Sequence, residues 1–375
     1  MRSVNDGRLL VAVAAALALV LSTPFVGQIR GAIQEALPGQ YRNIVAGSVA
    51  AIVTVAGLIA VTRIREDRLW RYGLLAAALA GGVGYGYVTA SGNAEVDAVE
   101  RFHFIEYGVL ALLFHRVWKD RGGAASLVFP ALSGILVGTL DEAFQWFIPA
   151  RVGELRDVLL NSAATVSGLA FAVALDVSRR AAGPARSTRR DLACGVAVAI
   201  AAVALFVHTV HLGYEVRDAT GGVFFSRFSE LGLREAAGDR SARWRTEPPV
   251  VLRRVSREDQ YLAEGLWHVQ RRNEAASAHD GWTAWQENQI LETWFAPVLD
   301  FPSYVNPGGS RWAATDRAAV GAEVDHRPRG QAFVSTANPM PIYTWNRGGF
   351  LAVAFLVIGV VVLVGVTPAS GRRPR

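Results

Sequence analysis

The chain has 375 residues, of which 51% are hydrophobic, and its mean hydropathy is positive at +0.25. This composition excludes one large soluble domain, and long apolar runs indicate insertion into a membrane. The net charge of +6 lies mostly in short segments between these runs, which argues against nucleic-acid binding. Because Cys194 is the only cysteine, a disulfide framework and a cysteine-based metal site are excluded as well.

Eight apolar runs are long enough, at roughly 20 residues each, to cross a membrane as helices. We expect these spans at about residues 9–27, 43–62, 72–90, 102–118, 126–148, 157–178, 192–212 and 348–367. In the third run, Gly81-Gly82-Val-Gly84-Tyr-Gly86 does not match a dinucleotide fingerprint, and it indicates close contact with another helix. The predicted fold class is an all-α polytopic membrane protein with about eight transmembrane helices.

The basic segments set the expected orientation of these spans. With eight spans, the arginine-rich stretches at residues 63–71, 115–121, 179–190 and 372–375 fall on one side, together with the N-terminus. Positively charged loops mark the cytoplasmic side. We therefore expect a multi-pass protein of the cell (inner) membrane with both termini in the cytoplasm.

Residues 213–345 form a sizeable polar block between the last two spans, and this topology makes the block extracytoplasmic. Acidic and basic residues are nearly balanced in it, and it holds most of the tryptophans, which is more typical of core packing than of sugar binding. The stretch 258–296 is predicted to be helical, and the chain after Pro297 to be irregular. The predicted domains are a six-span transmembrane domain at 1–180, a cytoplasmic basic linker with the seventh span at 181–212, a mainly helical extracytoplasmic domain at 213–345, the eighth span at 346–368, and a cytoplasmic tail at 369–375.

Polar side chains cluster at three helix ends that this topology directs outward. His103, Glu106 and Tyr107 are three and four residues apart at the start of the fourth span, so they share one helix face. The other members lie at the end of the fifth span, in the connection and at the start of the sixth: Asp141, Glu142, Gln145, Arg151, Asp157 and Asn161. Each ionised group at membrane depth raises the free energy of the inserted protein by roughly a few kcal/mol or more, unless the group is paired or hydrated.

The order and spacing of these residues resemble the VanZ-like family of bacterial membrane proteins. The pattern is His-x-x-x-Tyr, Asp-Glu-x-x-Gln, Pro-x-Arg and Asp-x-x-x-Asn before a glycine, and it falls on His103, Tyr107, Asp141, Glu142, Gln145, Pro149, Arg151, Asp157, Asn161 and Gly168. The resemblance covers about residues 40–178. The family's founding member is associated with resistance to the glycopeptide teicoplanin, so the resemblance implies a cell-envelope role and a link to glycopeptide susceptibility.

Two interpretations of the cluster remain open. In the first, Glu142, Arg151 and Asp157 form a structural ion-pair network, with His103 and Asn161 hydrogen-bonding inside it. In the second, the cluster is a site. Its candidate catalytic residues are then His103, Glu142 and Asp157, and its candidate ligand-binding residues are Glu106, Tyr107, Asp141, Gln145, Arg151 and Asn161. A metal is disfavoured because one histidine is a poor ligand count, and no cofactor is expected.

The first functional hypothesis is an envelope protein that binds or processes an anionic amphiphilic molecule, either a lipid or a cell-wall precursor. Its expected partners are membrane lipids and a lipid-linked or cell-wall precursor, with no nucleic acid. The alternative is a non-catalytic membrane scaffold or sensor that acts through its extracytoplasmic domain. A transporter is a third option, but the sequence contains no broken-helix pair or inverted repeat that supports it. Whether the protein is an enzyme stays open, as does its oligomeric state.

Overall fold

The computed structural model describes residues 2–90, 94–148, 151–176, 189–218, 222–243, 256–300, 308–324 and 332–367. Pro149, part of the basic linker (181–188) and the predicted tail (369–375) lie outside these residues. The chain divides into two compact units. Unit 1 consists of Met1–Gln145, Glu154–Phe206 and Ala352–Arg375, and unit 2 consists of Trp146–Gly153 and Val207–Leu351.

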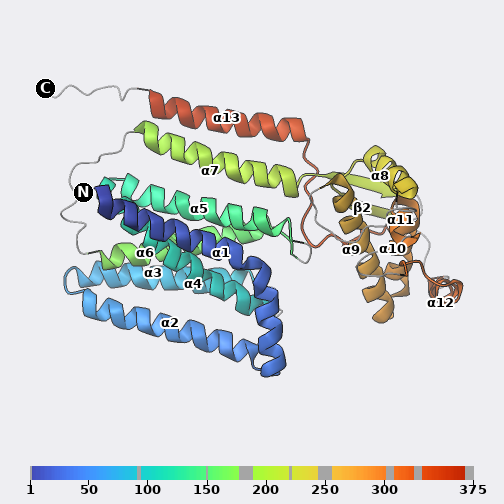
Figure 1. Ribbon diagram of the computed structural model, residues 1–375, viewed down its shortest axis with the longest axis horizontal. Coiled ribbons are helices and arrows are strands. Elements are labelled where there is room, and N and C mark those ends of the chain that lie inside the picture. The colour runs from blue at the N-terminus through green and yellow to red at the C-terminus, as the bar shows by residue number, and fades with distance from the viewer. Residues whose placement is uncertain are drawn as a thin grey trace. The chain divides into compact units, whose positions relative to one another are not determined.

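Each of the eight predicted spans forms a long helix (Figure 1). These helices are α1 (Arg2–Ala36), α2 (Tyr41–Arg63), α3 (Arg68–Val88), α4 (Ala94–Trp118), α5 (Ala125–Gln145), α6 (Leu155–Leu175), α7 (Arg189–Val210) and α13 (Arg347–Val366), with a short 3-10 helix η1 (Lys119–Arg121) after α4. Within the described residues, α1, α2, α5, α6, α7 and α13 are long and apolar enough to cross a membrane. The chain is therefore an all-α polytopic membrane protein, while crossing by α3 and α4 stays a prediction because they do not reach the same apolarity.

Helices α4 and α6 form the interior of unit 1. Helix α4 packs against α1, α2, α3, α5 and α6, and α6 packs against α3 and α5 as well. The two helices touch through their backbones, since a Cβ added at Gly168 would lie 2.4 Å from Cα of Gly108. Small residues permit such an approach between membrane helices. The amino-terminal ends of α4 and α6 are thereby held next to each other.

The glycines of α3 make less contact than the sequence predicts. A Cβ at Gly82 would meet the Phe104 ring at 3.2 Å, whereas nothing lies within 4 Å of one at Gly81, Gly84 or Gly86. The expected close contact is therefore confirmed at one of these positions only. A close backbone approach between helices occurs instead at Gly108 and Gly168, which the spacing of the α3 glycines does not indicate.

Unit 2 combines a hairpin with a helical core. Strands β1 (Tyr214–Asp218) and β2 (Gly222–Ser226) pair antiparallel, with Val216 opposite Phe224, and both side chains are fully buried. The helices of unit 2 are α8 (Glu230–Arg243), α9 (Arg257–Ser277), α10 (Gly281–Trp294), α11 (Ala296–Asp300) and α12 (Ala314–Val324). The core joins the hairpin to α8, α9, α10 and α11.

Two details of unit 2 differ from the sequence prediction. The stretch 258–296 is helical but divided, because His279 takes a positive φ of 58° and Asp280 caps α10 by accepting a hydrogen bond from the backbone N–H of Thr283. The prediction of irregular structure after Pro297 is wrong for the residues of α11 and α12, which are helical. Gly321 of α12 lies against Trp285 of α10, a tertiary contact that local composition does not reveal.

Two buried glutamates tie the segments of unit 2 together. Glu264 accepts hydrogen bonds from the Ser226 hydroxyl at 2.6 Å and the Arg227 backbone N–H at 3.1 Å, and burial raises the pKa of Glu264. Glu287 contacts Nδ1 of His268 at 2.6 Å and accepts from the Ser335 hydroxyl at 2.6 Å. Buried carboxyl groups need such partners, so both arrangements serve the fold of unit 2.

Candidate functional site

The carboxyl-terminal turn of α5 holds the centre of the site. Asp141 is 2% exposed, Glu142 is fully buried, and both are within an apolar helix. Asp141 accepts a hydrogen bond from the Thr23 hydroxyl of α1 at 2.8 Å and one from the Tyr107 hydroxyl of α4 at 3.2 Å. Asp141 therefore joins three helices through one carboxylate.

Glu142 faces a different set of partners from Asp141, because consecutive helical residues point about 100° apart. It accepts from Nε2 of Gln145 at 2.8 Å and from the backbone N–H of Glu154 at 3.1 Å. The N–H of Glu154 precedes α6 and has no partner within that helix. Glu142 thus fixes the start of α6 against the end of α5.

Asn161 of α6 is fully buried. Neither its amide oxygen nor its amide nitrogen has a hydrogen-bond partner among the residues that the structure describes. Gly138 of α5 lies directly beside it, since a Cβ there would be 2.9 Å from Cβ of Asn161 and 3.5 Å from Cε1 of Tyr107. A buried donor and a buried acceptor are therefore held next to the Tyr107 ring.

A half-buried rim surrounds this interior at the start of α6. Arg156 forms an ion pair with Glu100 of α4 at 2.6 Å and donates to the Thr89 carbonyl at 2.6 Å. Burial, followed by the charge of Asp157, raises the pKa of Glu154 to about 7. Glu100 and Asp157 lie close enough to act on that carboxyl group, so this rim is rich in acidic groups.

His103 and Glu106 occupy the face of α4 that leads to Tyr107. The His103 and Tyr107 rings stack with centroids 6.2 Å apart, and Nδ1 of His103 is 3.6 Å from Oε2 of Glu106. Glu106 is also within electrostatic range of Asp141. His103 and Glu106 therefore lie within ion-pair distance of each other, on the face of α4 that leads to Tyr107.

The structure brings together most of the residues that the sequence singles out. Tyr107, Asp141, Glu142, Gln145 and Asn161 meet in the interior, and the partially exposed His103, Glu106 and Asp157 lie around them. Arg151 belongs to the segment Trp146–Gly153 of unit 2, so its place in the site stays a prediction.

Three further members are not identified from the sequence: Thr23, Glu100 and Arg156. Thr23 is a polar residue inside the apolar run of α1, next to Pro24, and this is the signal that could have revealed it. Arg156 stands directly before Asp157, but its pairing with Glu100 depends on the packing of α4 against α6.

The chemistry of the cluster is that of carboxyl groups with neutral donors. Among the described residues, no group of three or more His, Cys, Asp and Glu side chains is arranged to hold a metal ion. The carboxylates can accept hydrogen bonds from hydroxyl or amino groups, and Arg156 can donate to an anion at the rim. Histidine and buried carboxyl groups can also exchange protons near neutral pH.

This arrangement defines a multi-pass helical membrane protein with a buried polar cluster between α4, α5 and α6. Residues 88–176 match the VanZ/LLP1 family model, which confirms the VanZ-like resemblance for this segment. The matched segment contains every residue of the cluster except Thr23. No curated protein and no solved structure matches the chain.

Proposed function

We propose that this VanZ-like membrane protein acts in the cell envelope, where its polar cluster binds or processes the headgroup of an anionic amphiphilic molecule. The molecule is a lipid or a cell-wall precursor, and the cluster faces outward. The match of residues 88–176 to the VanZ/LLP1 family model supports the role in the envelope. The residues around Asn161 are the proposed binding site. It carries with it the link to glycopeptide susceptibility that the resemblance implies.

The unsatisfied amide of Asn161 is the observation that carries this proposal. A purely structural network would hydrogen-bond this side chain, because leaving a buried polar group unpaired costs about 1–3 kcal/mol. Neither amide atom has a partner among the described residues, although Tyr107, Asp141 and Glu142 all lie in the same cluster. A buried unpaired group of this kind calls for a partner, and the proposal is that a ligand headgroup supplies it.

The charges around Asn161 indicate how a headgroup would be held. Arg156 at the rim supplies guanidinium donors for a phosphate or carboxylate. Asp141 and Glu142 supply acceptors for hydroxyl or amino groups, and the Asn161 amide supplies one donor and one acceptor. In this proposal His103, Glu142 and Asp157 are the groups that exchange protons if the ligand is processed.

The test replaces Asn161 by leucine, which has a similar shape and no polar atoms. Variants are returned to a strain that lacks the gene, and envelope lipids, cell-wall precursors and teicoplanin susceptibility are measured. We expect Asn161→Leu to lose the phenotype while its thermal stability in detergent stays equal or rises, because the unpaired amide is removed. Glu142→Gln and Arg151→Ala should lose the phenotype as well. An Asn161→Leu protein that restores the phenotype would refute the proposal.

A second candidate function rests on unit 2. Its buried core joins the hairpin to several helices, as expected of a segment that folds around its own centre. We propose as the alternative a non-catalytic scaffold or sensor, in which unit 2 meets a partner and the VanZ-like part is an anchor. Deletion of residues 213–345 separates the two proposals. If the shortened protein restores the phenotype, the scaffold proposal fails.

A further inference from the structure

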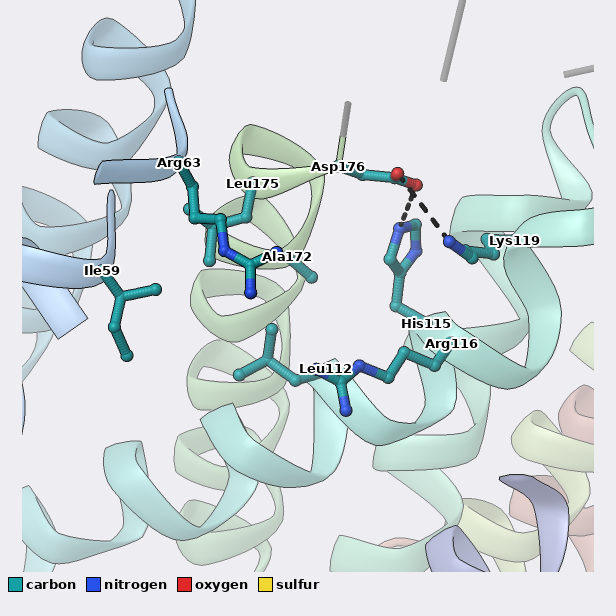
Figure 2. Close-up of a pocket in the computed structure, with 9 residues that line it drawn as sticks. All are labelled: Ile59, Arg63, Leu112, His115, Arg116, Lys119, Ala172, Leu175 and Asp176. Carbon is teal, nitrogen blue, oxygen red and sulfur yellow. Dashed lines mark hydrogen bonds and ion pairs between the residues drawn. The ribbon is translucent and has the colours of Figure 1, made fainter. Parts of the chain in front are cut away.

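A second polar feature lies at the opposite ends of α4 and α6 from the cluster around Asn161. A pocket of about 380 Å³ opens there between the carboxyl-terminal ends of α2, α4 and α6. Its apolar wall includes Ile59, Leu112 and Leu175, and its polar wall includes Arg63, Arg116 and Lys119 (Figure 2). The pocket therefore joins apolar side chains and cationic groups at a helix end.

The charge of the pocket is positive. Its acidic member is Asp176, whose carboxylate already contacts His115 at 3.3 Å and Lys119 at 3.9 Å (Figure 2). Arg63 and Arg116 form no hydrogen bond or ion pair through their side chains with any residue that the structure describes. Two guanidinium groups are thus available to an anion, and each can donate paired hydrogen bonds to phosphate oxygens.

The surroundings of the pocket favour an amphiphile over a free anion. On α2, the side chains of Val55, Leu58 and Ile59 are exposed on the helix surface. A spanning helix presents such side chains to acyl chains. Ile59 lines the pocket as well, so an apolar surface leads directly from the membrane-facing side of α2 to the two arginines.

We propose that this pocket binds the phosphate headgroup of an anionic phospholipid, with Arg63 and Arg116 as its principal ligands. The acyl chains lie along Ile59 and the neighbouring surface of α2, and Leu112 and Leu175 form the inner wall. Basic pockets between spanning helices are suited to such headgroups. This lipid site is independent of the function proposed for the Asn161 cluster.

The test uses the full chain, purified in detergent, and dioleoylphosphatidylglycerol as the anionic probe. Dioleoylphosphatidylcholine and inorganic phosphate are tested in parallel, with binding measured by native mass spectrometry and by the lipid-dependent rise in melting temperature. The pocket variant is Arg63→Gln with Arg116→Gln. Its matched control is Arg65→Gln with Arg68→Gln, which removes two exposed arginines, one from the α2–α3 connection and one from the start of α3, without touching the pocket.

We expect the anionic lipid to bind and stabilise the protein, and the pocket variant to bind it roughly thirty-fold more weakly. The control variant should keep wild-type binding, and Asp176→Asn should not weaken it, because a negative charge is removed. Equal losses in the pocket and control variants would overturn the proposal in favour of unspecific surface attraction. Stabilisation by inorganic phosphate equal to that by the lipid, or equal binding of both lipids, would overturn it as well.

Discussion

The hydroxyl of Tyr107 on α4 donates a hydrogen bond to Oδ2 of Asp141 on α5, and the Thr23 hydroxyl of α1 donates to the other carboxylate oxygen. Both bonds are buried, so each replaces contact with water in an apolar surrounding. The Asp141 carboxylate consequently links α1, α4 and α5 through hydrogen bonds. Its geometry decides where Tyr107 places its ring against Gly138 and Asn161.

Removal of the Tyr107 hydroxyl tests how much its hydrogen bond to Asp141 stabilises the protein. Tyr107→Phe leaves Asp141 with one hydrogen bond fewer, so we expect a loss of about 1 kcal/mol in unfolding free energy. Thermal unfolding of the full chain in detergent measures it as a lower melting temperature. The control is Tyr87→Phe, since Tyr87 is 84% exposed. Equal melting temperatures for the two variants would contradict the expected role.

The contact between Gly108 and Gly168 gives a second prediction. In Gly168→Ala the new Cβ would lie 2.4 Å from Cα of Gly108, so α4 and α6 must separate. Overpacking of this kind costs about 1–3 kcal/mol, and backbone on both sides leaves little room to relax. Gly81→Ala is the matched control, because nothing lies within 4 Å of a Cβ there. We expect destabilisation of the first variant only, measured by detergent-solubilised thermal unfolding.

Glu154 gives a prediction on pH. Because burial raises its pKa to about 7 in the folded protein, above the usual 4.5, the folded state favours the protonated carboxyl group. The stability associated with Glu154 is present below about pH 4.5 and is lost as the pH rises through about 7.

Glu154→Gln should remove this loss. We expect the variant to match the wild type at pH 4 and to exceed its stability at pH 8 by about 1 kcal/mol, allowing for water at this partly exposed position. Unfolding measured at both pH values provides the comparison. A difference that is the same at pH 4 and pH 8 would show that the Glu154 carboxyl group is not its source.

Glu287 gives a prediction for unit 2. Its carboxylate contacts His268 and Ser335 at 2.6 Å each and is fully buried. Glu287→Ala leaves both partners unpaired in the interior, so we expect destabilisation of about 3 kcal/mol or more. Glu274→Ala on the exposed side of α9 should cost much less. Urea unfolding of the full chain, followed by tryptophan fluorescence, checks both, and similar midpoints would contradict the prediction.

The long helices of unit 1 are predictable from the sequence because each observed helix coincides with an apolar run. The runs at 43–62 and 348–367, for example, become α2 (Tyr41–Arg63) and α13 (Arg347–Val366). A helix must be long and apolar to span a membrane, and both are local properties of the sequence. The polar end of α5 is predictable for the same reason, since Asp141 and Glu142 interrupt such a run.

The partners of these carboxylates are not predictable in the same way. Thr23 meets Asp141 across more than one hundred residues, and Arg156 meets Glu100 only because α4 packs against α6. The hairpin of unit 2 is missed as well. Its strands are five residues each, too short for a clear alternation, and the pairing of Val216 with Phe224 is stabilised by helices that follow much later in the chain.

Arg71 of α3 donates to the carbonyl oxygens of Ala174 at 2.8 Å and Asp176 at 3.3 Å, which close the end of α6. Thr23 and Tyr107 likewise precede Asp141 in the chain. In both cases the donor is synthesised before the acceptor that needs it. For Asp141 and for the end of α6 the order of synthesis therefore supplies the donor first, whereas Glu142 of α5 obtains its donors, Gln145 and the backbone N–H of Glu154, only from the chain that follows it.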